Sequence, residues 1–526
     1  MASHGPTHLT DHDTLTPGGK AYGLWFVCMI LGVVGLGVGL LLALLMSGDG
    51  HGWERFGFAY LTGYMYWLAI ALGCLFFVII THLFRAGWCV MVRRVAENGA
   101  AALPWLAVLS LPILLFVWSG DGYLYAWAQP KWAQMAAAHQ AEHEHDQEAQ
   151  HEDEHDTGTE VPEPHGDEHA RAADGLYYTA ADASHASGAH ASDTHVNANA
   201  PYQAAPDQSM VFHFLYDDYG QLTGKGLWLQ PWFFTLRWVV VLAIWCGIAL
   251  WYRRQSVRQD ASKDPALTNA REAAAPVSVI AFAFTVTLAA FDLVMSLDPT
   301  WYSTIFGVYY FANAFTGGLC AIILAHLLLQ RKGLVPTVNV EHYHDLGKLL
   351  FAFVFFWGYI AYSQYVLIWY PSVPEIAYWF QLRGATTVPD VPQYGSGWTW
   401  LALILLVGHL LIPFAFLLSR HVKRNRAALA AACVWLLVMI GIDLFWLIRP
   451  VLSSGIGHAN PMDAAVAFNV PELLMQLAVW VGIGGIAVAA AVRMARDTAL
   501  VAHGDPRLHE SLKLDTSAAA PLHDAH

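Results

Sequence analysis

Two aspartates occur near the ends of long apolar segments, each at the start of the same sequence motif. Asp292 begins the run DLVMSLDP and Asp443 begins the run DLFWLIRP, so each acid lies six residues before a charge that precedes proline. If these segments are membrane helices, each carboxylate lies about 10 Å inside the bilayer. A carboxylate at that depth is costly and is typical of proton or ion pathways. The repeated motif also predicts two related units.

Other ionisable residues occur along the apolar segments, and their expected depths form an inner and an outer group. Histidine changes charge near neutral pH, and a carboxylate can do so when it is buried, so both suit proton exchange. His409 falls near the middle of its segment, and we expect two polar half-paths that narrow there. The inner candidates are His82, His326, Glu341, His342, His344, Asp345 and Lys348, and the outer ones are Asp292, Asp298, Glu375, Asp443, Arg449 and Glu472.

The same residues also allow a structural interpretation. Asp443 or Asp298 could form a static ion pair with Arg449, and His409 could make a packing hydrogen bond. Residues 340–348 could form a polar turn or a docking patch. The sequence leaves both interpretations open.

These residues lie among ten apolar segments, each close to the length that crosses a bilayer. Of the 526 residues, 56% are hydrophobic and only 13% are charged. This composition predicts an all-α integral membrane protein with about ten transmembrane helices. The third is short and carries Pro104 and Pro112. The segments cover residues 22–46, 57–80, 103–118, 232–252, 276–297, 304–330, 347–370, 398–419, 428–448 and 473–494.

Similar sequences recur four helices apart. Helices 2 and 6 end around His82 and His326, and helices 5 and 9 carry the aspartate motifs. Because four is even, both copies have one orientation, which predicts two four-helix bundles (helices 2–5 and 6–9) flanked by helices 1 and 10. We divide the chain into a tail at 1–20, helices 1–3 at 21–118, a loop at 119–231, helices 4–5 at 232–297, helices 6–9 at 298–448, a loop and helix 10 at 449–494, and a tail at 495–526.

Basic residues are concentrated on one side of the predicted helices. With the N-terminus inside, the inner segments hold 20 of the 27 lysines and arginines, and the outer segments hold six. Cytoplasmic loops carry such an excess, so we expect both termini in the cytoplasm. The first 20 residues lack the basic start and cleavage site of a signal peptide. We expect a multi-pass protein of a bacterial inner membrane, and the net charge of −14 does not suit nucleic-acid binding.

The outer loop at 119–231 contains a low-complexity stretch between His139 and His195, with ten histidines and fifteen acidic residues. Such a composition cannot bury a core, so we expect disorder. Histidine-rich acidic tracts can bind Zn²⁺ or Cu²⁺, but no fixed ligand spacing occurs, and we favour a solvated insertion. The C-terminal tail from Arg493 is polar, and we expect it to be mobile.

The sequence offers little for a cofactor. Its six cysteines are scattered, with no C-x-x-C or C-x-x-C-H motif, so the chain has no iron–sulfur or c-type haem motif. His82 and His326 match in expected depth but fall near the inner edge, which is unfavourable for b-type haem, and His82 could be an interfacial side chain. No metal site, nucleotide-binding loop or nucleophile–base pair is visible.

Four strings of the sequence resemble one family. They are HLFRAGW at 82–88, FDLVMSLDPTWYST at 291–304, VEHYHDLGK at 340–348 and SRHVKR at 419–424. These strings are similar to the ActF membrane subunit of alternative complex III, within the NrfD/polysulfide-reductase membrane-subunit family. The resemblance covers roughly 20–120 and 225–450; the histidine-rich insertion at 131–210 and the C-terminal tail depart from it.

The resemblance implies an integral membrane subunit of a quinol:cytochrome c, or similar, oxidoreductase in a respiratory chain. The implied partners are a sister NrfD-like membrane subunit, an iron–sulfur subunit, multihaem and monohaem cytochrome c subunits and, in some assemblies, a terminal oxidase. Iron–sulfur clusters and haem c belong to those partners. The sister subunit is the better candidate for quinol oxidation, and the ActF type is proposed to conduct protons. A quinone site in this chain stays open.

Two other functions compete with this one. The chain could be the quinone-binding anchor of another NrfD-type reductase, or a secondary transporter, since repeats with mid-membrane charges also occur in transporters. Against a transporter, the prolines of the two motifs fall at helix ends and do not break the helices at mid-membrane.

Overall fold

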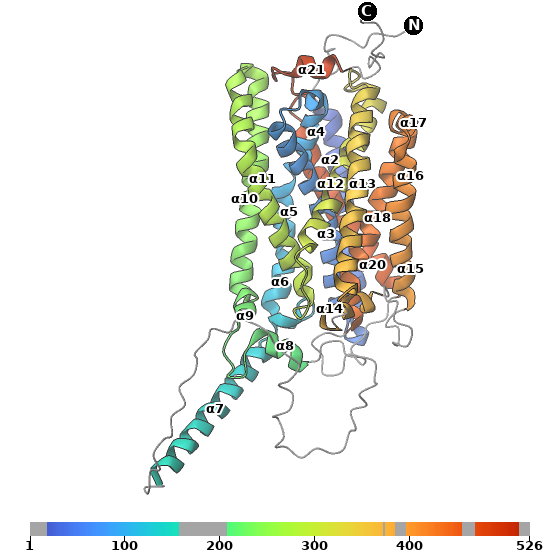
Figure 1. Cartoon of the computed structure of the whole chain (residues 1–526). Helices are drawn as coiled ribbons and strands as arrows, with labels where there is room; N and C mark the ends of the chain where they lie inside the picture. The colour runs from blue at the N-terminus through green and yellow to red at the C-terminus, as the bar shows by residue number, and fades with distance from the viewer. Residues whose placement is uncertain (1–17, 157–207, 372–373, 384–395, 455–468, 515–526) are drawn as a thin grey trace, which may run out of the picture.

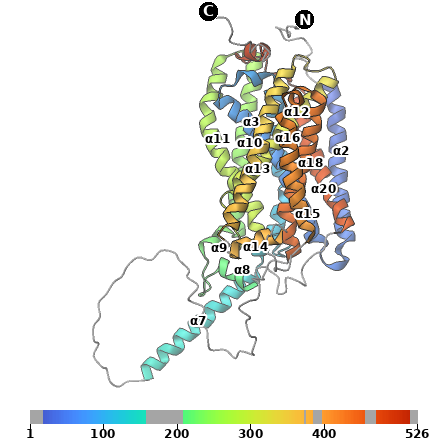
Figure 2. The same ribbon diagram turned by 45° about the vertical axis from the view of Figure 1, so that its right-hand side comes forward.

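The computed structural model describes residues 18–156, 208–371, 374–383, 396–454 and 469–514. Over these residues the regular elements are helices, with no β-strand, and ten helical segments are long and apolar enough to cross a membrane. The chain is an all-α, multi-pass membrane protein, as its composition predicts. The spans run side by side, while α7 (Lys131–Asp156) projects from one end and α21 (Leu508–Leu512) lies across the other (Figures 1 and 2).

The spans agree with the predicted segments, and two of them are built from several shorter helices. Proline lacks the N–H that continues a helix, and the third span changes helix next to Pro104 and Pro112. In order, the spans are α2 (Gly18–Leu45), α3 (Gly52–Leu83), α4 to α6 (Val90–Ala100, Leu103–Leu109, Leu111–Ser119), α10 (Pro231–Ser262), α11 (Pro265–Leu293), α12 (Phe306–Arg331), α13 (Val340–Trp369), α15 with η6 and α16 (Ser396–Ile404, Leu405–Leu411, Ile412–Leu418), α18 (Arg426–Ser454) and α20 (Val470–Ala495).

Short helices join the spans at both ends of the bundle. On the side from which α7 projects, hereafter the α7 end, are α8 (Gln208–Leu215), α9 (Gly224–Trp228) and α14 (Pro374–Leu382). On the side that carries α21, hereafter the α21 end, are η2 (Gly87–Cys89) and α17 (Arg420–Arg424).

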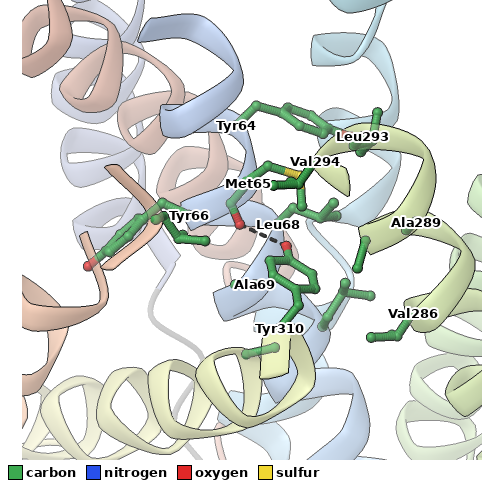
Figure 3. Packing of buried hydrophobic residues seen from close by; sticks show 14 of the residues in the cluster. Tyr64, Met65, Tyr66, Leu68, Ala69, Val286, Ala289, Leu293, Val294 and Tyr310 are labelled. Carbon is green, nitrogen blue, oxygen red and sulfur yellow. Dashed lines mark hydrogen bonds between the residues drawn. The ribbon is translucent and has the colours of Figure 1, made fainter. Parts of the chain in front are cut away.

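The spans form the two predicted four-helix groups. Helices α3, α4–α6, α10 and α11 pack with one another, as do α12, α13, α15–α16 and α18. The groups meet mainly along α3 and α12, and α2 and α20 pair beside α3. Figure 3 shows this junction from close by: Tyr310 of α12 donates a hydrogen bond at 2.8 Å to the carbonyl of Met65 of α3, near Leu293 of α11.

Helices α3 and α12 approach closely because glycines face each other. A Cβ atom on Gly73 would lie 1.9 Å from the carbonyl oxygen of Ala314, and one on Gly318 would lie 2.4 Å from the carbonyl carbon of Gly73. Small residues allow helices to pack this closely in lipid. The junction of the two groups therefore requires glycine at both positions.

Gly73→Ala should destabilise the protein by about 1–3 kcal/mol, because backbone atoms must move to admit the methyl group. Gly247→Ala on α10 is the matched control, since nothing lies within 4 Å of an added Cβ there and alanine favours helix. Thermal unfolding in detergent compares the two variants. Equal melting temperatures would contradict the close packing of α3 against α12.

The prediction of disorder from His139 to His195 is wrong for residues 139–156, which continue α7. This part is rich in glutamate and also contains glutamine, and both residues favour helix. The ring of His139 stacks on Phe212 with centroids 5.0 Å apart, and Gln140 donates to the carbonyl of Gly220 at 2.9 Å. Residues 157–195 lie outside the described part of the chain.

The prediction of a mobile C-terminal tail from Arg493 is also wrong for the residues up to 514. Helix α20 continues to Ala495, and the segment after it crosses the α21 end of the bundle. Leu500, Val501 and Ser511 of this segment are buried. Buried apolar side chains such as Leu500 and Val501 help to hold this polar-looking segment in place.

Candidate functional site

The carboxylate of Asp443 is fully buried within α18 and is held by three neutral donors. Tyr309 Oη donates to Oδ1 at 2.6 Å, and Asn313 Nδ2 and Trp357 Nε1 donate to Oδ2 at 2.6 and 3.1 Å. Tyr309 and Asn313 are four residues apart on α12 and share one helix face. Among the described residues no cation pairs with Asp443. A carboxylate without countercharge is costly to keep ionised, and these donors offset part of that cost.

His409, in the π-helical turn η6, packs against the same tryptophan that donates to this carboxylate. Its ring stacks on Trp357 with centroids 3.9 Å apart, and neither ring nitrogen has a hydrogen-bond partner among the described residues. Pro413 has no N–H for the carbonyl of His409, four residues earlier. Such π turns are frequent at functional sites. The packing hydrogen bond that the sequence allowed for His409 is not formed among the described residues.

Asp292, the counterpart of Asp443 in the sequence, has a different environment at the α7 end. Arg237 of α10 binds it through two hydrogen bonds, Nε to Oδ2 at 3.0 Å and Nη2 to Oδ1 at 2.9 Å. Trp228 Nε1 donates to Oδ1 at 3.0 Å, and the guanidinium lies 3.9 Å from the centre of the Trp228 ring. Asp292 is therefore charge-compensated in a closed ion pair.

The remaining outer candidates also lie at the α7 end. Asp298 accepts hydrogen bonds from the hydroxyl of Tyr378 and, at 2.6 Å, from Thr300 Oγ1. Arg449 pairs with Glu472 through two hydrogen bonds. Glu375 belongs to α14, and its side chain lies outside the described part of the structure.

Two candidate histidines lie together at the α21 end. His326 of α12 is buried, with Nδ1 2.8 Å from the carbonyl oxygen of Ile322, and His342 of α13 lies near it. His342 Nδ1 is 2.8 Å from Asn339 Oδ1, and its Nε2 is 2.9 Å from Ser511 Oγ. The C-terminal segment therefore takes part in this cluster.

His82 lies at the same end and mirrors His326. Its Nδ1 is 2.7 Å from the carbonyl oxygen of Val78, one turn earlier on α3, and its ring packs against Tyr252. The repeated bond to the residue four positions earlier is consistent with the repeated units.

The candidates in 340–348 form ion pairs at the same surface. Arg424 pairs with Glu341 at 2.5 Å, and Lys348 pairs with Asp345 at 2.6 Å. His344 Nδ1 is 3.8 Å from Asp345 Oδ1. The interpretation of residues 340–348 as an exposed polar turn is wrong, because they form the start of α13, and Glu341, His342 and His344 are buried there.

Asp443 and His409 both contact Trp357, whereas the α21-end histidines lie far from this group. Asn313 and His326 are thirteen residues apart on α12, or about 20 Å along the helix. The buried residues between them include Leu319, Cys320 and Ile323. Apolar side chains therefore separate the α21-end histidines from Asp443 along α12. The two half-paths stay a prediction.

Arginines of the α21 end clamp the C-terminal segment through Asp505. Arg93 binds the Asp505 carboxylate, and Arg271 lies 3.7 Å from it. Burial alone raises the pKa of Asp505, but Arg93, the backbone N–H of Arg507 and Arg271 together hold it below its usual range. A lowered folded-state pKa adds stability above the unfolded value of about 3.9, and this stability is lost as pH falls through the folded value. The clamp is therefore complete at neutral pH.

Asp505→Asn should release the C-terminal segment, because Arg93 and Arg271 lose their shared carboxylate. Trypsin should then cleave at Arg507 faster, about tenfold for each 1.4 kcal/mol of lost docking energy. Asp497→Asn is the control, since the side chain of Asp497 is 67% exposed. Limited proteolysis followed by mass spectrometry reads the result; equal cleavage in both variants would contradict the clamp.

Among the described residues no group of three or more histidine, cysteine or acidic side chains has the geometry to hold a metal ion. The six cysteines are unpaired, and Cys320 and Cys433 lie close together between α12 and α18. The site is built from hydrogen-bonding and titratable side chains.

Sequence reasoning missed the partners that distinguish the two aspartates. Tyr309 and Asn313 look like ordinary helix residues, and only their spacing of four hints at a shared face. Arg237 could have been found from the sequence, because a lone arginine within an apolar segment indicates an acidic partner. Tyr378 and Arg383 lie within residues 371–397, which read as a loop in the sequence, although the structure forms α14 there.

No protein-family model matches the chain, and no curated protein sequence matches it. The fold and the buried acid therefore define its class: an all-α, multi-pass membrane protein with a titratable carboxylate inside one of its two four-helix groups.

Proposed function

We propose that this chain conducts protons as an integral membrane subunit of a quinol-oxidising respiratory complex, with Asp443 as the group that takes up and releases the proton. The observation that carries the proposal is the environment of Asp443: full burial, three neutral donors and no ion-pair partner among the described residues.

This environment supports proton exchange because it can accommodate Asp443 both as a carboxylate and as a neutral carboxyl group. When ionised, the carboxylate accepts hydrogen bonds from Tyr309, Asn313 and Trp357, which spread its charge. When protonated, it is neutral and costs little to bury. His409, with two unpartnered ring nitrogens, is the neighbouring group suited to pass a proton on.

The resemblance of residues 82–88, 291–304, 340–348 and 419–424 to the ActF subunit of alternative complex III supports the respiratory setting. In that setting electrons pass through partner subunits that carry iron–sulfur clusters and c-type haems. This chain then needs no redox cofactor of its own. The excess of basic residues at the α21 end supports a cytoplasmic location for that end in a bacterial inner membrane.

Purification of the complex through an affinity tag on this chain tests the setting. The proposal expects co-purified multihaem cytochromes, an iron–sulfur subunit and a second multi-pass subunit, with haem c absorption and quinol:cytochrome c activity. A chain that purifies alone and without haem would contradict it and would favour a transporter. A single catalytic reductase subunit as partner would favour the quinone-binding anchor.

A further inference from the structure

The end of the C-terminal segment binds both four-helix groups, and Ser511 of α21 contacts residues of each. Its hydroxyl donates to the carbonyl of Trp88 at 2.7 Å and accepts a hydrogen bond from the backbone N–H of Met91, in α4 of the first group, at 3.3 Å. Ser511 Oγ also lies 2.9 Å from Nε2 of His342, at the start of α13 in the second group. Ser511 and His342 are both buried. The C-terminal segment therefore shapes the surroundings of this histidine.

These contacts determine which nitrogen of His342 carries the hydrogen in the neutral ring. The single hydroxyl hydrogen of Ser511 is used by the carbonyl of Trp88, so Ser511 can only accept from His342 Nε2. The backbone N–H of Asn339 donates to His342 Nδ1 at 3.2 Å, which requires a free lone pair on that nitrogen. Both contacts place the hydrogen on Nε2 and leave Nδ1 as the basic atom.

Nδ1 of His342 also has a partner for the charged ring. The amide oxygen of Asn339 lies 2.8 Å from Nδ1 and can accept a hydrogen bond once Nδ1 is protonated. The orientation of this amide is set, because its Nδ2 donates to the carbonyl of Leu514 at 3.1 Å and its oxygen accepts from the backbone N–H of Glu341 at 3.0 Å. The close oxygen favours a proton on Nδ1, whereas burial favours the neutral ring. The surroundings therefore accommodate both states of His342.

The other two histidines of this end lack such an arrangement. The Nδ1 atoms of His82 and His326 lie 2.7 and 2.8 Å from backbone carbonyls one turn earlier, and a carbonyl only accepts. Their basic atom is therefore Nε2, which has no hydrogen-bond partner in the described part of the chain. A proton added to Nε2 would create a buried N–H without an acceptor, which is costly. Of the three histidines, His342 is the one with partners for both of its states.

Few charges act on His342. The titratable group of another span that acts on it is His326 of α12. The two acids in the same part of α13, Glu341 and Asp345, pair with basic residues, and the contact from the C-terminal segment is the neutral hydroxyl of Ser511. Over the described ranges no carboxylate forms an ion pair with His342. A proton on this ring is therefore not held in place by a static ion pair, which suits proton exchange.

We propose that His342 takes up protons from the aqueous side at the α21 end, and that the C-terminal segment positions it through Ser511 and Leu514. A hydronium ion from that side gives its proton to Nδ1 and leaves as water. The ring becomes a cation, Nε2 keeps its hydrogen bond to Ser511, and Nδ1–H donates to the amide oxygen of Asn339. The apolar layer along α12 separates this step from Asp443, an arrangement that prevents protons from leaking through at rest. The role in uptake rests on the proposed function.

Solid-state nitrogen NMR of the complex with isotope-labelled histidine tests the positioning role, and the signals of His342 are those that disappear in His342→Gln. At about pH 8, above the usual histidine pKa of about 6.5, Nε2 should carry the hydrogen and Nδ1 should not. In Ser511→Ala the nearby oxygen of Asn339 should draw the hydrogen to Nδ1 instead. Lys513→Ala, at an exposed position of the same segment, should keep the wild-type pattern. Hydrogen on Nδ1 in the neutral wild-type ring, or an unchanged pattern in Ser511→Ala, would overturn the positioning role.

Proton translocation in liposomes tests the uptake role. The side chain in His342→Gln can still donate to Ser511 but has no basic nitrogen, so the rate should fall by about 100-fold. A wild-type rate in His342→Gln, or a loss that occurs only in His326→Gln, would overturn the assignment while Asp443→Asn still slowed translocation. If Asp443→Asn left translocation intact, the proposed function itself would fall.

Discussion

Asp443→Asn should lower the rate of proton translocation by about 100-fold or more, while the complex still assembles. Asparagine keeps the size of aspartate. Its amide oxygen can accept from Asn313 and Trp357, and its NH2 can donate to the hydroxyl of Tyr309, so the packing around α18 should persist. It has no proton to exchange, and a lost acid–base group typically costs two to four orders of magnitude. Translocation in liposomes and the subunit composition of the purified complex measure the two parts of this prediction.

Asp443→Glu is the matched variant, because it restores a carboxyl group in a slightly longer side chain. It should recover part of the lost rate. Equal loss in both variants would show that the site needs its exact packing more than its proton. Normal translocation in Asp443→Asn would contradict the role of this residue.

Asp292→Asn should destabilise the protein by about 3–5 kcal/mol, because it leaves the buried guanidinium of Arg237 without its countercharge. The structure gives this pair two hydrogen bonds, with Trp228 against both members. The melting temperature in detergent and the yield of folded protein should both fall. The two substitutions should therefore have different effects: Asp443→Asn should lower proton translocation, and Asp292→Asn should lower stability.

The double substitution Asp292→Leu with Arg237→Met is the control for this pair. Replacing a buried ion pair by apolar side chains of similar size is often neutral or stabilising, so the double variant should be more stable than Asp292→Asn. If Asp292→Asn unfolds no earlier than wild type but blocks translocation, Asp292 belongs to the proton route after all.

The fold could be predicted well from the sequence because membrane helices are read from apolar length alone. The ten spans and the four-helix repeat follow from segment lengths and from the two aspartate motifs. The structure of the segments outside the membrane was harder to predict from the sequence. Residues 139–156 of α7 and the buried C-terminal segment both have polar sequences. The order of the C-terminal segment depends on tertiary contacts such as that of Asp505 with Arg93.

The site could be predicted only in part. Depth and charge singled out both aspartates and His409, and the structure places His409 beside the ring that binds Asp443. The partners could not be predicted, because which helix faces which is not encoded in hydropathy. The expected partner Arg449 instead binds Glu472, and Arg237 compensates Asp292.

The central claim is that Asp443 changes its protonation state during turnover. Infrared difference spectra of the complex, reduced with quinol and then reoxidised, test it most directly, because a carboxyl group that gains or loses a proton gains or loses a carbonyl band. The account predicts such a band in the wild type, its shift in Asp443→Glu and its absence in Asp443→Asn. An unchanged band in Asp443→Asn, or no carboxyl band in the wild type, would contradict it.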